Sequence, residues 1–290
     1  MNILSEDGKS VINLKSWDEV FERPGFKRGV NPTEVKLKRI IGKYDFSDEN
    51  HCGLSSCNTS HKKGYLVVCS SNIETNIGHK CGKKHFGVDF NELERTFRKD
   101  INVRNARENI QRRSGELDFI RERVNHLWRA EGLELFCKVR DLKFSKKGLT
   151  GALRVKLERR AKSGDEKVYE SVKASEADIV LEEDKLKREL TDSEKQQLRV
   201  NVPIGIIYGV RAFNSFSVIK EVLHDEIPTL LDELDELDTA QLTDTQLLNW
   251  SKRLNGIDTQ LMAAQGAIED CRRLLVDSNI SFIKQHEHLI

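Results

Sequence analysis

Residues 51–87 of the chain read HCGLSSCNTSHKKGYLVVCSSNIETNIGHKCGKKHFG. This stretch holds four of the six cysteines and four of the eight histidines within 37 residues. Thiolates and imidazoles are the ligands that Zn²⁺ takes most often, and in a reducing compartment clustered cysteines bind metal more often than they form disulfides. The stretch therefore predicts a zinc site.

The ligands of a zinc site usually come in two pairs, each on a tight turn that lets them converge. The predicted ligands are Cys52 and Cys57 as the first pair, Cys81 in the second pair, and either His61 or His85 as the fourth ligand; His79 and Cys69 are weaker candidates. The spacing alone does not decide between His61 and His85.

The segment between the two ligand groups has strand composition. Gly64–Ser70 (GYLVVCS) predicts one strand, Ser71 and Asn72 predict a turn, and a second short strand ends at Ile77 before a helix that begins near His79. A ligand-bearing turn, a hairpin and a ligand at a helix start, in that order, resemble the treble-clef class of zinc fingers over residues 48–90. The pattern CGxxxC, HxxGY, IGHxCGxKHFG is also similar to cysteine-rich segments of uncharacterised bacterial and phage-type proteins.

The predicted zinc site has the composition of a structural site. The acids near it are Asp48, Glu49, Glu74 and Asp89, and none forms an H-x-E or H-E-x-x-H arrangement that would supply a catalytic base. The chain also lacks the GxxxxGK[ST] and GxGxxG phosphate loops and the GxSxG elbow. These absences favour a non-enzymatic protein, with a zinc-dependent nuclease as the less favoured alternative.

The composition is that of a folded, helix-rich protein. Of the 290 residues, 38% are hydrophobic and 33% are charged, with only four prolines. The first forty residues contain no apolar run long enough for a signal peptide, and nowhere do eighteen apolar residues follow one another. We therefore expect a cytoplasmic protein without a membrane partner.

Two long stretches repeat apolar residues at alternating spacings of three and four. The first predicts a helix from about Phe90 to Leu135, with Arg113 at the one polar position of its apolar seam. The second predicts a helix whose seam comprises Leu247, Trp250, Leu254, Ile257, Leu261, Ile268 and Leu275. Narrow seams of this kind pair with other helices, either within one chain or across a homodimer.

The region between the long helices is more mixed. Leu149–Leu157 and Lys167–Val172 flank a turn-like segment and predict a β-hairpin with a basic face, Asp184–Arg199 predicts a charged helix, and Ser217–Leu237 predicts a helix kinked at Pro228. The predicted fold is thus α+β and predominantly helical, with the two heptad helices flanking a small insertion. The predicted domains are a zinc-finger module (1–90), a long helix (91–136), a hairpin-containing middle region (137–215) and a helical, coiled-coil region (216–290).

The charge is unevenly distributed along the chain. Residues 1–220 carry a net charge of +10 and residues 221–290 a net charge of −9. The predicted nucleic-acid contacts lie in the zinc module and in the basic hairpin: Lys62, Lys63, Lys80, Lys83, Lys84, Lys146, Lys147, Arg154, Lys156, Arg159 and Arg160. The sequence therefore favours a zinc protein that contacts nucleic acid and oligomerises through helices. The alternative is a scaffold or adaptor of phage or mobile-element type, whose helices bind protein partners.

Overall fold

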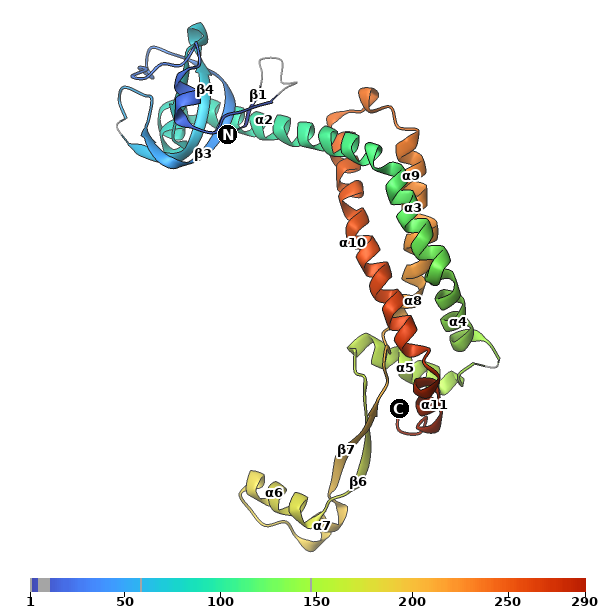
Figure 1. Cartoon of the computed structure of the whole chain (residues 1–290). Helices are drawn as coiled ribbons and strands as arrows, with labels where there is room; N and C mark the ends of the chain where they lie inside the picture. Colours follow the sequence, from blue (N-terminus) through green and yellow to red (C-terminus); the bar gives the residue numbers. More distant parts are fainter. Residues whose placement is uncertain (1, 5–10, 58, 147) are drawn as a thin grey trace. The chain divides into compact units, whose positions relative to one another are not determined.

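The computed structural model describes residues 2–4, 11–57, 59–146 and 148–290 (Figure 1). The fold is α+β and mostly helical, as predicted, with two small antiparallel sheets. The chain forms two compact units: the first comprises residues 1–112 and 238–252, and the second comprises residues 113–237 and 253–290. Within the described residues, no helix has both the length and the apolar character needed to cross a membrane.

The first unit is built on a five-stranded antiparallel sheet with the strand order β2-β1-β3-β4-β5. The strands are β1 (Asn2–Leu4), β2 (Val11–Asn13), β3 (Leu37–His51), β4 (Ser60–Cys69) and β5 (Glu74–Ile77). The predicted strand and turn around Ser71 and Asn72 are confirmed, and both turn residues have positive φ angles, of 58° and 56°. A single tight turn thus connects β4 to β5.

Helices cover both faces of this sheet. Side chains alternate along β4, so that Tyr65 and Val67 pack with Phe90 of α2 (His79–Gly115), whereas Leu66 and Val68 pack with Trp17. Trp17 belongs to α1 (Trp17–Phe21), which Ser16 caps through its side chain. The second half of β4, Tyr65–Cys69, is buried on both sides, and its sequence is accordingly a continuous apolar run.

The first long predicted helix is confirmed, but it is not one uninterrupted rod. α2 contains a break at Gly87 (φ 51°, ψ −120°) and ends at Gly115, and the chain continues as α3 (Leu117–Leu127). In the first unit, the beginning of α10 (Asp244–Leu274) packs along α2, where Asn109 Nδ2 donates to Ser251 Oγ at 3.0 Å and Lys99 pairs with Asp244 at 2.7 Å.

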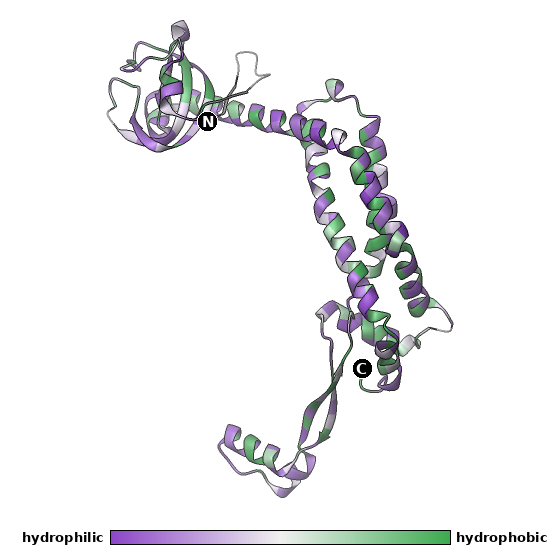
Figure 2. Ribbon diagram, in the orientation of Figure 1, coloured by the Kyte–Doolittle hydropathy of each residue, from purple (hydrophilic) through white to green (hydrophobic). Residues whose placement is uncertain are grey.

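The second unit is a bundle of helices that alternate apolar and polar positions (Figure 2). The bundle comprises α3, α4 (Leu133–Phe144), α5 (Gly151–Ser163), α8 (Ala212–Lys220), α9 (Ile227–Asp235), the remainder of α10, and α11 (Asp277–Gln285). Two further helices of this unit, α6 (Glu176–Leu186) and α7 (Asp192–Gln197), lie outside the bundle, between β6 (Lys167–Lys173) and β7 (Arg199–Ile206) in the chain. π-helical turns at Trp128–Gly132 and Glu221–Glu226 connect α3 to α4 and α8 to α9. The helix predicted over Ser217–Leu237, broken or kinked at Pro228, changes its geometry before the proline, at the π-helical turn Glu221–Glu226, and Pro228 lies in the first turn of α9.

The apolar seam of α10 is buried within the chain. Leu247, Leu254, Ile257, Leu261 and Ile268 are fully or almost fully buried, whereas Trp250 and Leu275 are half-buried. Salt bridges at the edges of this seam join α10 to neighbouring helices of the second unit: Arg253 to Glu233 on α9 at 2.5 Å, and Arg113 to Asp258. The helices therefore pack with one another without a second copy of the chain, and the homodimer stays a prediction.

Arg113 explains the polar position of the first seam. Its side chain is 9% exposed and pairs with Asp258 on α10 and with Glu116 at 3.4 Å. The buried guanidinium thus replaces an apolar side chain in the seam and pairs with carboxylates whose side chains are 57% and 40% exposed.

The predicted basic hairpin is wrong in its first strand. Residues 151–163 form α5, because Thr150 caps its start by accepting from the Leu153 N–H at 3.2 Å, and Gly164 ends it with a φ of 70°. β6 (Lys167–Lys173) pairs instead with the distant β7 (Arg199–Ile206). The buried positions of α5, which are Leu153, Leu157 and Ala161, have helical spacing.

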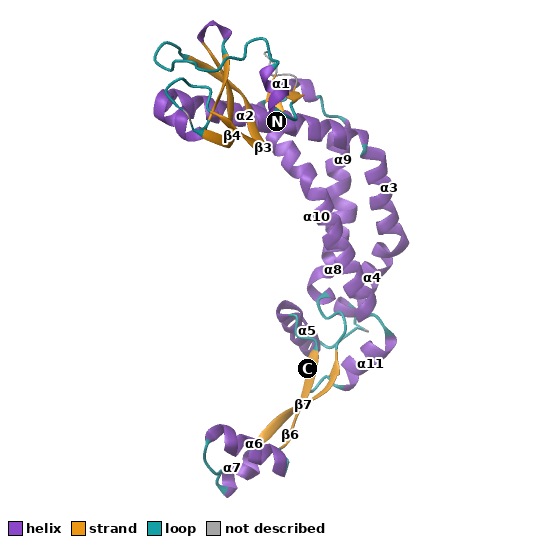
Figure 3. Ribbon diagram, turned by 60° about the vertical axis from the view of Figure 1, so that its left-hand side comes forward, coloured by secondary structure: helices purple, strands orange, loops and turns teal. Residues whose placement is uncertain are grey.

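The predicted charged helix at Asp184–Arg199 is also wrong, because the segment is divided between two shorter helices. α6 (Glu176–Leu186) and α7 (Asp192–Gln197) lie between β6 and β7 in the chain (Figure 3). Lys187 ends α6 in a left-handed conformation, and Thr191 with Glu194 forms a capping box that starts α7.

Candidate metal centre

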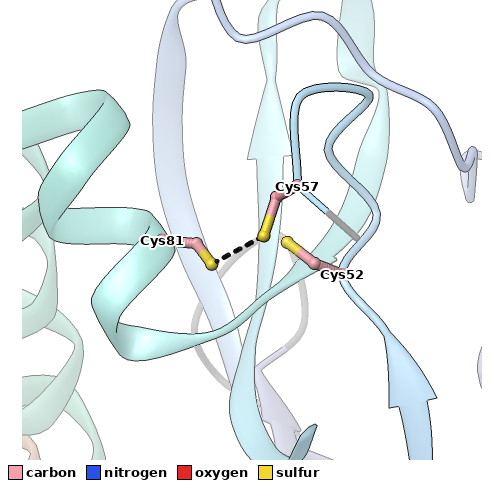
Figure 4. A group of neighbouring side chains, drawn as sticks. All are labelled: Cys52, Cys57 and Cys81. Atoms are coloured by element: carbon pink, nitrogen blue, oxygen red, sulfur yellow. Dashed lines mark hydrogen bonds between the residues drawn. The ribbon is translucent and has the colours of Figure 1, made fainter. Parts of the chain in front are cut away.

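Three cysteines from distant parts of the first unit converge at one point. Their sulfur atoms all lie within 4.8 Å of one another, and the Cys57 and Cys81 sulfurs are 3.1 Å apart. Figure 4 shows the three side chains pointing toward one another, Cys52 and Cys57 from the segment between β3 and β4, and Cys81 from the first turn of α2. A group of this kind can hold a metal ion.

The segment that carries Cys52 and Cys57 is held in a tight turn against β5. The Cys57 N–H donates to the Leu54 carbonyl at 3.1 Å, and the Gly53 N–H donates to the Asn76 carbonyl at 2.7 Å. A Cβ atom at Gly53 would lie 2.0 Å from Thr75 Oγ1, so only glycine permits this close approach to β5. The turn therefore fixes both sulfurs relative to the strand that leads into α2.

The three thiols influence one another's ionisation. Burial opposes ionisation of Cys57, but hydrogen bonds from the Cys81 thiol and from Thr59 lower its pKa to about 7. Burial, the hydrogen bond to Cys57 and the neighbouring thiolate charges raise the pKa of Cys81 to about 12. Burial likewise raises the pKa of Cys52. Bringing three thiolates together without a cation is thus unfavourable, and a bound divalent ion would stabilise all three.

Neither predicted fourth ligand belongs to the group of atoms within 4.8 Å of one another. His61 lies on β4, where its Nδ1 is 3.0 Å from the Tyr44 hydroxyl and its Nε2 is buried with no hydrogen-bond partner. Burial lowers the pKa of His61. His85 is half-buried on α2, about one helical turn after Cys81. The two histidines therefore differ in their surroundings, although the sequence ranks them equally.

The weaker candidates have other roles. Cys69 is fully buried among the apolar side chains between the sheet and α2. His79 Nε2 lies 3.5 Å from a carboxylate oxygen of Glu94. Neither side chain belongs to the cysteine group.

Sequence reasoning missed a buried carboxylate on the part of α2 that follows the break at Gly87. The Tyr65 hydroxyl donates to Glu94 at 2.5 Å, and Arg98 pairs with the same carboxylate. Burial opposes ionisation of Glu94, but these bonds from Tyr65 and Arg98 dominate and lower its pKa. The i, i+4 spacing of Glu94 and Arg98 was the only signal in the sequence, and that spacing is common on exposed helices.

The lysines of the predicted nucleic-acid surface lie on the two segments next to the cysteine group. Lys62 and Lys63 are exposed on β4, and Lys80, Lys83 and Lys84 are exposed on the first part of α2. Lys63 pairs with Asp45 at 2.8 Å. Among the described residues, the structure gives no ion pair to the other four.

The basic residues predicted on the hairpin lie elsewhere, on and just before α5. Arg154 stacks on Phe144, Lys156 donates to the Glu287 carbonyl at 3.1 Å, and Arg160 bonds Asp165 and the Lys167 carbonyl. Lys146 and Arg159 are exposed, and Lys147 lies outside the described residues. Several of these cations therefore hold the second unit together.

Comparison with protein-family models, with curated proteins and with solved structures finds no match to this chain.

Proposed function

We propose that this chain is a non-enzymatic zinc-binding protein whose metal centre orders a lysine-bearing surface for contact with nucleic acid. The convergence of the Cys52, Cys57 and Cys81 sulfurs within 4.8 Å supports the metal centre. We assign zinc because soft thiolate ligands favour it, and a thiolate-rich site is typical of structural rather than catalytic zinc.

In this proposal, the metal connects two segments of the first unit. Cys57 lies before β4 and Cys81 lies after β5, in the first turn of α2, so an ion held by both ties the turn to the helix. The lysines next to these ligands are then presented on a fixed backbone. Several lysines on a rigid surface can neutralise several phosphates at once.

The zinc proposal is tested by the metal content of the full-length protein, purified without chelators. We expect one zinc ion per chain, and its loss in Cys52→Ser and Cys81→Ser. Cys137→Ser is the matched control, because Cys137 is half-buried on α4, outside the cysteine group. Wild-type protein without bound metal would refute the proposal.

The nucleic-acid proposal is tested by the salt dependence of binding to DNA and RNA oligonucleotides. Lys83→Glu with Lys84→Glu should weaken binding, and the slope of log K against log salt should become shallower by about 0.9 for each phosphate that the variant no longer neutralises. Lys252→Glu with Lys284→Glu changes the net charge equally at exposed sites and should leave binding almost unchanged. Equally weakened binding in both pairs, or no binding at low salt, would contradict an interaction at this surface.

A second candidate function, a scaffold or adaptor that binds protein, has support from α6. Val180, Leu181 and Leu186 are 62%, 60% and 46% exposed, although they are large and apolar. Neighbouring apolar side chains of this kind often mark protein contacts. If α6 mediates self-association, Val180→Lys with Leu181→Lys should reduce the mass measured by light scattering at high protein concentration, without changing zinc content.

A further inference from the structure

Three thiolates fill three of the four positions of a tetrahedral zinc ion. A structural site obtains its fourth ligand from the protein, whereas an open position would admit water. The identity of the fourth ligand therefore decides whether the centre is closed. His61 and His85 are the two imidazoles that the sequence offers, and the structure gives them different surroundings.

Hydrogen bonds around His61 determine which of its ring nitrogens is available. The Tyr44 hydroxyl donates to the Ile77 carbonyl at 3.4 Å, and the same oxygen lies 3.0 Å from His61 Nδ1. A hydroxyl has one proton, so if it is used toward Ile77, the oxygen accepts from an Nδ1–H. The neutral ring then carries its lone pair on Nε2. Ligating histidines in metal sites typically hold their other nitrogen in this way.

The free nitrogen of His61 is buried and has no partner. Nε2 is one of the few buried polar atoms in the described part of the chain without a hydrogen bond. A buried acceptor of this kind is unfavourable unless something binds to it. A metal ion would satisfy it.

The ring of His61 packs on Gly78, close in the chain to a backbone contact of Cys52. A Cβ atom at Gly78 would lie 3.2 Å from His61 Nε2, so the ring packs directly on this glycine. The Cys52 sulfur lies 3.9 Å from the carbonyl of Asn76, two residues before Gly78. The end of β5 and the residue that follows it therefore contact both the imidazole and a predicted ligand.

The competing groups lack this arrangement. His85 is half-buried on α2, and no described residue forms a hydrogen bond with its ring. Asn76 Oδ1 is also buried without a partner, but amide oxygens suit magnesium and calcium better than a thiolate-bound zinc ion.

We propose that His61 Nε2 is the fourth ligand and closes a Cys₃His zinc site, with Tyr44 as the residue that positions the imidazole. This inference rests on the proposed zinc function. It assigns no part of the coordination to His85.

X-ray absorption of zinc in the full-length protein tests the ligand directly. We expect three sulfurs at about 2.3 Å, one nitrogen at about 2.0–2.1 Å, and the outer scattering of an imidazole ring. His61→Ala should lose the imidazole scattering and keep three sulfurs, whereas His85→Ala should keep both. Loss of the imidazole in His85→Ala alone would overturn the inference.

A measurement on the wild type avoids any effect of the variants on folding. Long-range ¹⁵N–¹H NMR of the zinc-loaded protein should show His61 protonated at Nδ1, with the Nε2 shift of a metal-bound nitrogen. An unbound His61 would refute the assignment.

The positioning role is tested by zinc affinity, measured by competition with a chelator. Tyr44→Phe keeps the buried ring but removes the hydroxyl, and it should lower the affinity by about 10–100-fold. Tyr65→Phe removes a different buried hydroxyl, the one that bonds Glu94, and should leave the affinity within about threefold of wild type, a change of less than 1 kcal/mol. Equal affinities for wild type and Tyr44→Phe would exclude the positioning role.

The outcomes separate the two proposals. Wild-type protein that binds no zinc refutes the function. Zinc bound by three sulfurs without an imidazole, or with His85, refutes only the assignment of His61.

Discussion

The basic residues beside the cysteine group and those on α4 and α5 are similar in density but differ in what surrounds them. Lys80, Lys83 and Lys84 are exposed on a helical segment that also carries Cys81. Lys143, by contrast, is 10% exposed, donates to the Phe213 carbonyl at 2.7 Å and pairs with Glu158 at 3.0 Å. One group of cations faces solvent, and the other binds helices to one another.

This difference shows that the basic residues of a sequence can have either of two roles: they face solvent, or they contact other parts of the fold. Cations near backbone carbonyls, carboxylates and aromatic faces form internal contacts, whereas the lysines on the segments that carry the cysteine group are exposed. Lys143 also lies between the rings of Phe144 and Phe216, at 5.4 and 5.5 Å. Removal of a lysine should therefore affect stability in the second unit, and in the first unit it should affect only the nucleic-acid binding that we propose.

The largest expected effect comes from metal removal. In small zinc modules the ion contributes on the order of 10 kcal/mol to folding. A strong chelator should therefore abolish protection from hydrogen exchange at residues 52–57 and 79–86, while α5 stays protected. Exchange measured by mass spectrometry checks this, and the zinc-loaded protein is the control. If the chelator lowers protection equally in both units, or does not lower it in the first unit, the two basic regions do not differ in their dependence on a metal.

A smaller effect is expected at Lys143. Lys143→Met keeps the aliphatic stem but leaves the Phe213 carbonyl without its donor, so the free energy of unfolding should fall by about 1–3 kcal/mol. Lys146→Met is the matched control, because Lys146 is exposed on the segment that follows α4, and its effect should stay within about 0.5 kcal/mol. Urea denaturation measures both. If the two variants are equally stable, Lys143 does not hold the helices together.

The smallest expected effect concerns Glu94, which joins the part of α2 after the break at Gly87 to Tyr65 on β4. Its pKa is lowered from 4.5 in the folded protein, so its contribution is fully present above that value and is lost as the pH falls through the lower, folded-state pKa. Glu94→Gln should cost about 1 kcal/mol near neutral pH and weaken the acid sensitivity of the first unit. Glu92→Gln, exposed on the same helix, should retain the wild-type profile. Identical acid unfolding of all three proteins would contradict this role.

Local patterns were sufficient to predict β4, β5 and the two long helices, but not β1, β2 or the long strand β3. The run GYLVVCS and the Ser71–Asn72 turn depend on neighbouring residues only, and so do the apolar spacings of α2 and α10. The convergence of Cys52, Cys57 and Cys81 followed from the chemistry of their side chains.

The errors arose where a distant partner decides the structure. β6 pairs with residues about thirty positions further along the chain, beyond α6 and α7, and no nearby residue indicates this. The caps at Thr150 and Gly164 resemble turn residues until the helix between them is known. The difference between His61 and His85 is likewise invisible in the spacing, because it depends on a hydroxyl from β3 and a carbonyl from β5.

The break at Gly87 divides α2 into two parts that can lose their order separately. The eight residues from His79 to Phe86 precede a backbone conformation that is not helical, so fraying of this short segment does not have to spread into the remainder of the helix. Loss of the ion would then act as a local event confined to one end of the first unit. The rest of α2, together with the start of α10 packed along it, would keep its own cooperative stability.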